Sequence, residues 1–144
     1  MKYNKSFSDG NFDDYKKYLN GIKKYMQIEL YNFIIESKHH DLGEKSLHDS
    51  RIEKIEFNYN FTNNESNIII SLLGEKRHFI LHFFKIKRYK IKQMLENNGY
   101  TDLITYEIYL NNRKEKTFGF RAEFSNSDIS IICKEIKIEE KLNE

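Results

Sequence analysis

The chain has 144 residues, which fits one domain and is too short for two ordinary ones. Charged residues make up 32% of it but nearly balance, with a net charge of +2, so the composition indicates neither a nucleic-acid-binding protein nor an acidic mimic of nucleic acid. The 11 Phe and 10 Tyr exclude a globally disordered chain, because disordered chains contain few aromatic residues.

The sequence gives no sign of secretion or of membrane insertion. Cys133 is the single cysteine, so no internal disulfide is possible. The first residues lack the apolar run of a signal peptide, and the longest apolar runs fall far short of the roughly 20 residues that span a bilayer. We therefore expect a cytoplasmic protein with no membrane partner.

One amphipathic helix is predicted over residues 12–38. Apolar residues recur there in steps of three and four, which places them on one face of a helix. These residues are Phe12, Tyr15, Leu19, Ile22, Met26, Leu30, Phe33 and Ile34. Gly21 could mark a break into two helices or a close approach to the sheet, and we keep a single helix.

The rest of the chain has the alternating pattern of half-buried strands. The predicted strands cover residues 51–61, 66–73, 77–86, 103–110, 116–124 and 128–138. A short helix is expected near residues 88–97, because Ile91, Met94 and Leu95 have helical spacing. Short connections favour antiparallel pairing, so we expect a single α+β domain over residues 1–144, with the helix packed on a strongly curved sheet of about six strands. The sheet face opposite the helix is the first place to look for function.

Two His-Asp pairs raise the possibility of a metal-dependent hydrolase. The residues concerned are His39, His40, His48 and Asp49, and imidazole and carboxylate groups can hold a metal that activates water. Phosphohydrolases with such pairs build the site on a helical bundle, whereas here the second pair runs straight into a predicted strand. We therefore expect no metal and place His39, His40 and Asp41 in an exposed turn.

Three other features are weighed in the same way. His78 and His82 are four residues apart, but on a strand without Cys or acidic partners they are weak evidence for zinc. Cys133 is expected as a buried thiol on the apolar face of the last strand. Five basic residues within 85–92 could contact phosphates of a nucleic acid. They are Lys85, Lys87, Arg88, Lys90 and Lys92.

The stretch Leu47-His48-Asp49-Ser50-Arg51-Ile52, followed by alternating strands, resembles a segment of small uncharacterised bacterial proteins, some of them immunity-like. The resemblance implies no catalytic residues, and it implies a structural role for His48 and Asp49 at the start of the first strand. Immunity proteins against nucleases are often strongly acidic, and this chain is not.

From the sequence we expect no catalytic residue and no cofactor. The favoured function is non-enzymatic protein interaction, with a toxin or a second copy as partner, through a surface rich in Tyr and Phe, since such residues are enriched in interfaces. The alternatives are nucleic-acid binding through residues 85–92 and, less favoured, a metal-dependent hydrolase.

Overall fold

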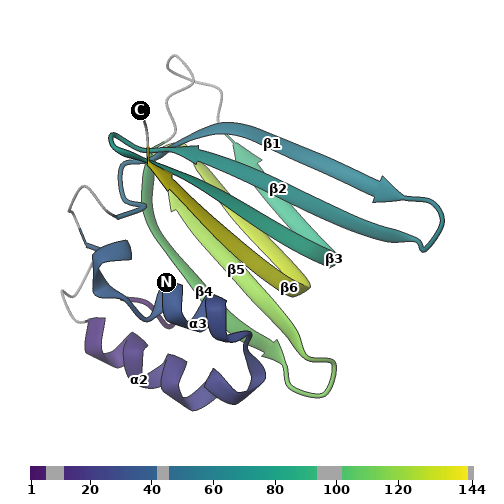
Figure 1. Ribbon diagram of the computed structural model, residues 1–144, viewed down its shortest axis with the longest axis horizontal. Helices are drawn as coiled ribbons and strands as arrows, with labels where there is room; N and C mark the ends of the chain where they lie inside the picture. The colour runs from purple at the N-terminus through teal and green to yellow at the C-terminus, as the bar shows by residue number, and fades with distance from the viewer. Residues whose placement is uncertain (6–11, 42–45, 94–101, 143–144) are drawn as a thin grey trace.

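A computed structural model describes residues 1–5, 12–41, 46–93 and 102–142, which form an α+β fold (Figure 1). The helical elements are α2 (Phe12–Ile22), η1 (Lys23–Tyr25), α3 (Ile28–Ile34) and η2 (Ser37–His39). The strands are β1 (Arg51–Asn60), β2 (Glu65–Leu73), β3 (Arg77–Gln93), β4 (Leu103–Asn112), β5 (Thr117–Phe124) and β6 (Ser127–Leu142). The predicted fold class, helices packed with a six-stranded antiparallel sheet, is confirmed.

The strands form one antiparallel sheet in the order β1-β2-β3-β6-β5-β4 (Figure 1). Strands that follow each other in the chain pair as hairpins, except that β3 pairs with β6. That long-range pair joins the two three-stranded blocks into one sheet. It also leaves β1 and β4 as the two edge strands.

One face of the sheet, which we call the inner face, carries the core. Residues directly opposite each other on paired strands share a face, and one such row runs through Phe57, Ile68, Phe83 and Ile136. The last three of these side chains are buried in the same cluster as the apolar stripes of α2 and α3. The helices therefore pack on the inner face.

The helix expected over residues 12–38 is divided into two. The backbone is extended at Met26 and Gln27, where ψ is 148° and 138°, and the chain reverses so that α2 and α3 lie side by side (Figure 1). Gly21 is not the break, because it lies inside α2. Two shorter helices keep the whole apolar stripe on the inner face.

The prediction of a short helix over residues 88–97 is wrong for its first part, because β3 continues as a strand to Gln93; residues 94–97 lie outside the described residues. A β-bulge shifts the register between Ile86 and Arg88, and Lys85 has a positive φ of 56°. The bulge interrupts the alternation of inward side chains. Of Ile91, Met94 and Leu95, whose spacing had predicted the helix, only Ile91 is described, and it lies in β3. The other strands match closely, although β6 continues to Leu142.

The two edge strands meet at one end of the sheet. The Asp49 N–H donates to the Leu103 carbonyl at 2.9 Å, and the Leu103 N–H donates to the Ser50 carbonyl at 2.8 Å. Arg51 and Asp102 form an isolated antiparallel bridge beside them. The sheet is not closed beyond this point, and its strong curvature stays a prediction.

Candidate functional site

The outer edge of β4 is capped by two tyrosines of α2. The Tyr15 hydroxyl accepts a hydrogen bond from the Ile108 N–H at 2.8 Å and donates one to the Ile108 carbonyl at 2.7 Å. The Tyr18 hydroxyl accepts from the Leu110 N–H at 3.0 Å. These bonds occupy backbone groups that an edge strand otherwise offers to another chain.

Two more side chains extend this capping along β4. The Asn4 amide donates to the Tyr106 carbonyl at 2.8 Å, and Nδ1 of His48 donates to the Ile104 carbonyl at 2.9 Å. His48 thus ties the segment before β1 to the opposite edge of the sheet. The resemblance predicted a structural role for His48 and Asp49, and the contact of His48 with β4 agrees with such a role for His48. The role of Asp49 stays a prediction.

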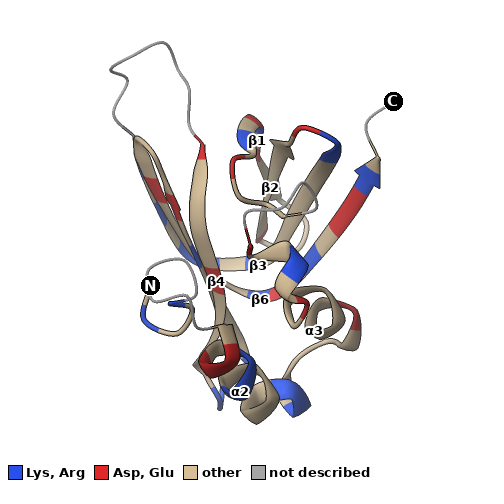
Figure 2. Ribbon diagram, turned by 90° about the vertical axis from the view of Figure 1, so that its left-hand side faces the viewer, with Lys and Arg blue, Asp and Glu red and all other residues tan. Residues whose placement is uncertain are grey.

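Residues 2–4 lie against β4 on the face of the sheet opposite the inner face, which we call the outer face, next to α2 (Figure 2). The backbone N–H groups of Lys2, Tyr3 and Asn4 all donate to the carboxylate of Glu107, at 3.2, 2.8 and 3.1 Å. Glu107 is fully buried, and Arg121 lies 3.6 Å from it. A buried charge held by three donors and a cation is satisfied, so Glu107 is not available for chemistry.

The outer edge of β1 is different. In the part of the chain that the structure describes, no hydrogen bond from outside β2 reaches the backbone of residues 52–60. The start of β1 carries a bulge between Ile52 and Lys54 and the bridge at Arg51, but residues 55–60 have neither. This stretch is an open strand edge, able to pair with another strand.

Exposed aromatic side chains gather beside this open edge, and we call them the aromatic patch. Phe57, Tyr59, Phe61 and Tyr89 are exposed by 54%, 48%, 85% and 54%. The Phe57 and Tyr89 rings lie 5.3 Å apart, and Tyr59 and Phe61 meet edge to face at 4.7 Å. A pocket of about 150 Å³ lies against Phe57, Tyr59 and Tyr89.

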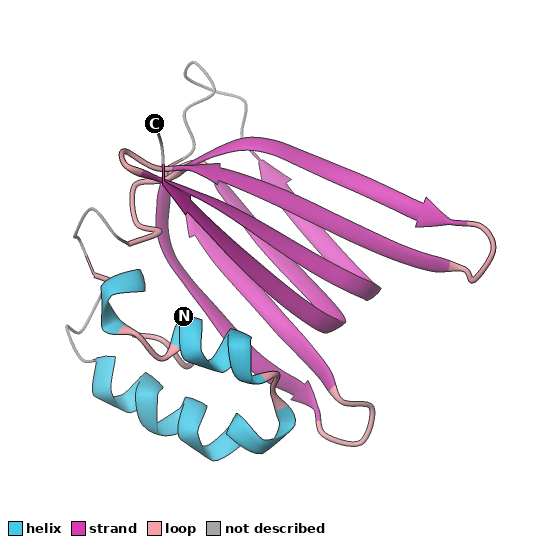
Figure 3. Ribbon diagram, viewed as in Figure 1, coloured by secondary structure: helices cyan, strands magenta, loops and turns pink. Residues whose placement is uncertain are grey.

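Phe57, Tyr59 and Tyr89 of the aromatic patch lie on the inner face, and not on the opposite face where we expected function. Tyr89 is opposite the buried Ile131, and Phe57 is opposite the buried Ile68. The helices cover the β4 side of this face, whereas the β1–β2 hairpin extends away from them (Figures 1 and 3). The alternating sequence pattern placed Phe57 and Tyr59 on the same face of their strand. Only the positions of the helices show that the β1 end of that face is uncovered.

The prediction that His39 and His40 lie in an exposed turn is wrong for both side chains. His39 is 3% exposed, stacks on Phe33 with ring centroids 3.7 Å apart, and has Nδ1 2.6 Å from the Phe33 carbonyl. Burial lowers its pKa, although that hydrogen bond and Glu140, 3.5 Å from Nε2, act in the opposite direction. His39 is therefore a packed core side chain.

His40 is held neutral inside the same region. Its Nε2 lies 2.8 Å from the Ile34 carbonyl and its Nδ1 lies 3.0 Å from the Asn4 amide, which matches a ring that donates through Nε2 and accepts through Nδ1. It stacks on Tyr106 at 4.7 Å. Burial lowers the pKa of His40 to about 4. Both ring nitrogens are occupied, so His40 cannot hold a metal without losing these bonds.

The other residues considered as metal ligands, His48, Asp49, His78 and His82, are not gathered at one point. Nε2 of His48 lies 3.2 Å from Asp49, its neighbour in the chain. His78 contacts Glu53 at 3.1 Å and His82 contacts Glu139 at 3.3 Å, so these histidines have different carboxylate partners. Within residues 1–5, 12–41, 46–93 and 102–142, no three His, Cys, Asp or Glu side chains are grouped to hold a metal.

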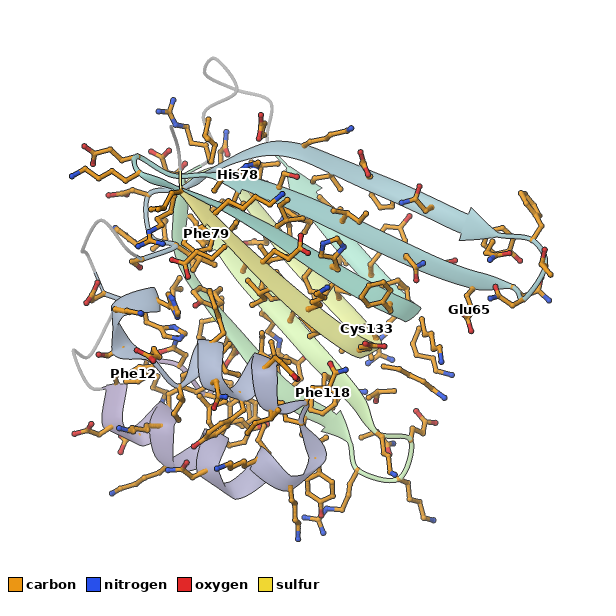
Figure 4. All side chains as sticks on the ribbon, in the orientation of Figure 1. Phe12, Glu65, His78, Phe79, Phe118 and Cys133 are labelled. Carbon is orange, nitrogen blue, oxygen red and sulfur yellow. The ribbon has the colours of Figure 1, made fainter. Side chains whose placement is uncertain are left out.

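Cys133 lies in β6, well apart from His78 (Figure 4). It is fully buried on the inner face, opposite Phe118, as the strand pattern predicted. Burial raises the pKa of its thiol to about 12. A thiol that stays protonated is a poor nucleophile.

The basic segment is divided between different surroundings. Lys90 and Lys92 line a pocket of about 360 Å³ together with Arg121, Glu123 and Asp128, among other residues. Lys85 and Lys87 line a separate pocket near Lys134. Arg88 alternates with Lys90 and Lys92 along β3, so these three share the outer face.

No model of a known protein family matches the sequence, and no curated protein matches it. The resemblance of residues 47–55 therefore stays a prediction. None of the helices in the described ranges is long and apolar enough to cross a membrane.

Proposed function

We propose that this protein is a non-enzymatic binding module that recognises another protein by accepting an extended segment along the open edge of β1. The observation that supports this is the difference between the two edges. The edge of β4 is capped by Tyr15, Tyr18, Asn4 and His48, whereas the edge of residues 55–60 has no such contact among the described residues. Strand addition supplies main-chain hydrogen bonds, and neighbouring side chains supply specificity.

The aromatic patch would supply that specificity. Tyr and Phe are enriched at the centres of protein interfaces, and each large ring removes roughly 150–250 Å² from water when fully buried. Phe61, at 85% exposure, has the most surface left to bury. A strand added to β1 would lie beside Phe57 and Tyr59.

The nature of the partner follows from the sequence expectations. The resemblance to immunity-like bacterial proteins makes a toxin polypeptide one class to test, and a second copy of the chain is the other. We expect this interaction in the cytoplasm.

Affinity capture with matched variants tests the proposal. The immobilised wild-type protein and the F57S/F61S variant are compared in extracts of the source cells, with bound proteins identified by mass spectrometry. The control is I28S on α3, because Ile28 is also 51% exposed but lies away from β1. We expect a protein that binds the wild type and I28S and is lost from F57S/F61S.

The opposite pattern would reject the proposal. If F57S/F61S captures the same proteins as the wild type, or if neither captures any protein in stoichiometric amount, β1 is not the binding edge. Circular dichroism of each variant shows that loss of capture is not loss of fold.

Nucleic-acid binding is a second proposal, and one observation favours it. Arg88, Lys90 and Lys92 share the outer face of β3, and the latter two lie beside Arg121 around one pocket. Phosphate contacts make binding fall steeply with salt. RNA and DNA titrations at low and high salt should show such a dependence, with a loss in K90A/K92A but not in K85A, whose lysine lines another pocket. Salt-independent or undetectable binding removes this proposal.

A further inference from the structure

We infer that the strand added to β1 comes from a second copy of the chain, paired antiparallel about a two-fold axis at Phe57. The inference rests on the proposed binding edge and names its occupant. In a symmetric pair of this kind the same residues face each other from both sides. Each sheet would then continue into the other through the two β1 strands.

The sequence of β1 is complementary to itself in this register. With Phe57 opposite Phe57 of the second copy, Ile55 lies opposite Tyr59, and these are the inner-face positions. Opposite residues share a face, so the apolar positions of the two copies meet. The aromatic side chains of the two copies would then lie side by side on one continuous inner face.

The outer-face positions also agree. In this register Glu56 lies opposite Asn58 of the second copy, and Lys54 lies opposite Asn60. Amides can bond to either charged group, and no like charges face each other. The charges of β1 therefore permit the pair.

Neighbouring registers are less favourable. An axis at Glu56 places that carboxylate opposite its own copy, which is destabilising. An axis at Ile55 draws in the bulge at Glu53 and the residue Arg51, which already bridges to Asp102. An axis at Asn58 leaves fewer strand residues paired. The register at Phe57 uses residues 54–60 and leaves out both the bulge and the bridge.

Two substitutions at Asn58 provide a matched test, because this side chain is exposed and either change should leave the fold intact. N58E places a carboxylate opposite Glu56 of the second copy, and N58K places an ammonium group there. The symmetry repeats each change twice. We expect the dimer dissociation constant, measured by sedimentation across a concentration series, to rise about 2- to 30-fold in N58E and to fall by a similar factor in N58K.

Cysteine cross-linking reads the register directly. Mixed E56C and N58C proteins should form a disulfide-linked heterodimer on oxidation, whereas E56C alone should not. A heterodimer of E56C with K54C would instead place the axis at Ile55 and overturn the register. Cys133 is buried and should not interfere.

Three results would overturn the inference of a second copy paired about an axis at Phe57. They are a wild-type monomer at every concentration, a dimer that N58E and N58K affect equally, and a dimer without the E56C–N58C cross-link. A monomer whose capture of another protein still depends on Phe57 and Phe61 would reject this inference alone. A monomer whose capture ignores those residues would reject the proposed function as well.

Discussion

Replacing Tyr15 by Phe tests the capping of β4 with the removal of one oxygen atom. The Tyr15 side chain is fully buried, and its hydroxyl is the partner of both the N–H and the carbonyl of Ile108. Without it, both backbone groups lose their partner inside the protein. A buried polar group left unpaired costs about 1–3 kcal/mol, so the loss of two partners in Y15F should lower the free energy of unfolding by about 2–6 kcal/mol.

The matched control is Y18F. The Tyr18 hydroxyl accepts a single bond, from the Leu110 N–H, and its side chain is only half buried. Water can replace that bond, so we expect a loss of about 1 kcal/mol. Urea unfolding followed by circular dichroism measures the loss of stability in Y15F and in Y18F. With an m-value of roughly 2 kcal/mol per molar, the Y15F midpoint should fall by about 1–3 M.

Alkaline pH gives a second reading of the same side chain. Burial raises the pKa of Tyr15 well above its ordinary value, whereas in the unfolded chain it ionises near about 10. The unfolded state therefore loses its proton first, and stability that is present below pH 10 is lost as the pH rises above it. Y15F should show a shallower loss. If Y15F is no less stable than Y18F and keeps the wild-type alkaline slope, the capping does not stabilise the fold.

Three further predictions concern the core. Burial lowers the pKa of His40 to about 4, below the roughly 6.5 of an unfolded chain, so stability should fall by about 3 kcal/mol as the pH drops from 6.5 to 4; an NMR titration in which the His40 ring protonates near pH 6.5 would contradict this. G119A should lower the free energy of unfolding by about 1–3 kcal/mol, because an added Cβ overlaps the Tyr109 ring that lies on Gly119, whereas G21A, with nothing within 4 Å, should raise the free energy of unfolding by up to about 1 kcal/mol. Cys133 should resist alkylation in native buffer and react only in denaturant, since its thiol is buried with a pKa raised to about 12; rapid native labelling would refute that.

Much of the fold could be predicted because its signals are local. The steps of three and four over residues 12–34 and the alternation of the later strands need only neighbouring residues, and they gave the α+β class and five of the six strands with small errors at their ends. The sixth, β3, was cut short because the bulge near Lys85 breaks the alternation. The helix is divided at Met26 and Gln27, where the backbone is extended, and the spacing of the apolar residues does not show this break.

The candidate site depended on contacts between distant parts of the chain. Composition indicated an aromatic interaction surface, and alternation placed Phe57 and Tyr59 on one face of a strand. Neither could show that α2 and α3 cover only part of that face. The same holds for His40, whose burial comes from packing against Tyr106, 66 residues further along the chain.

The sequence by itself determined most of the strands and the antiparallel pairing within each three-stranded block, since the side-chain period and short hairpins fix these locally. The pair between β3 and β6, which joins the two blocks, is a long-range contact. Only the tertiary structure decided which edge is closed and which is open. Tyr15 reaches the backbone of Ile108 across 93 positions of sequence, and no periodicity encodes such a contact. The edge of β1 is open and its aromatic patch is exposed because, among the described residues, the helices and the capping side chains lie at the other side of the sheet. The placement of these elements is a property of the folded chain as a whole.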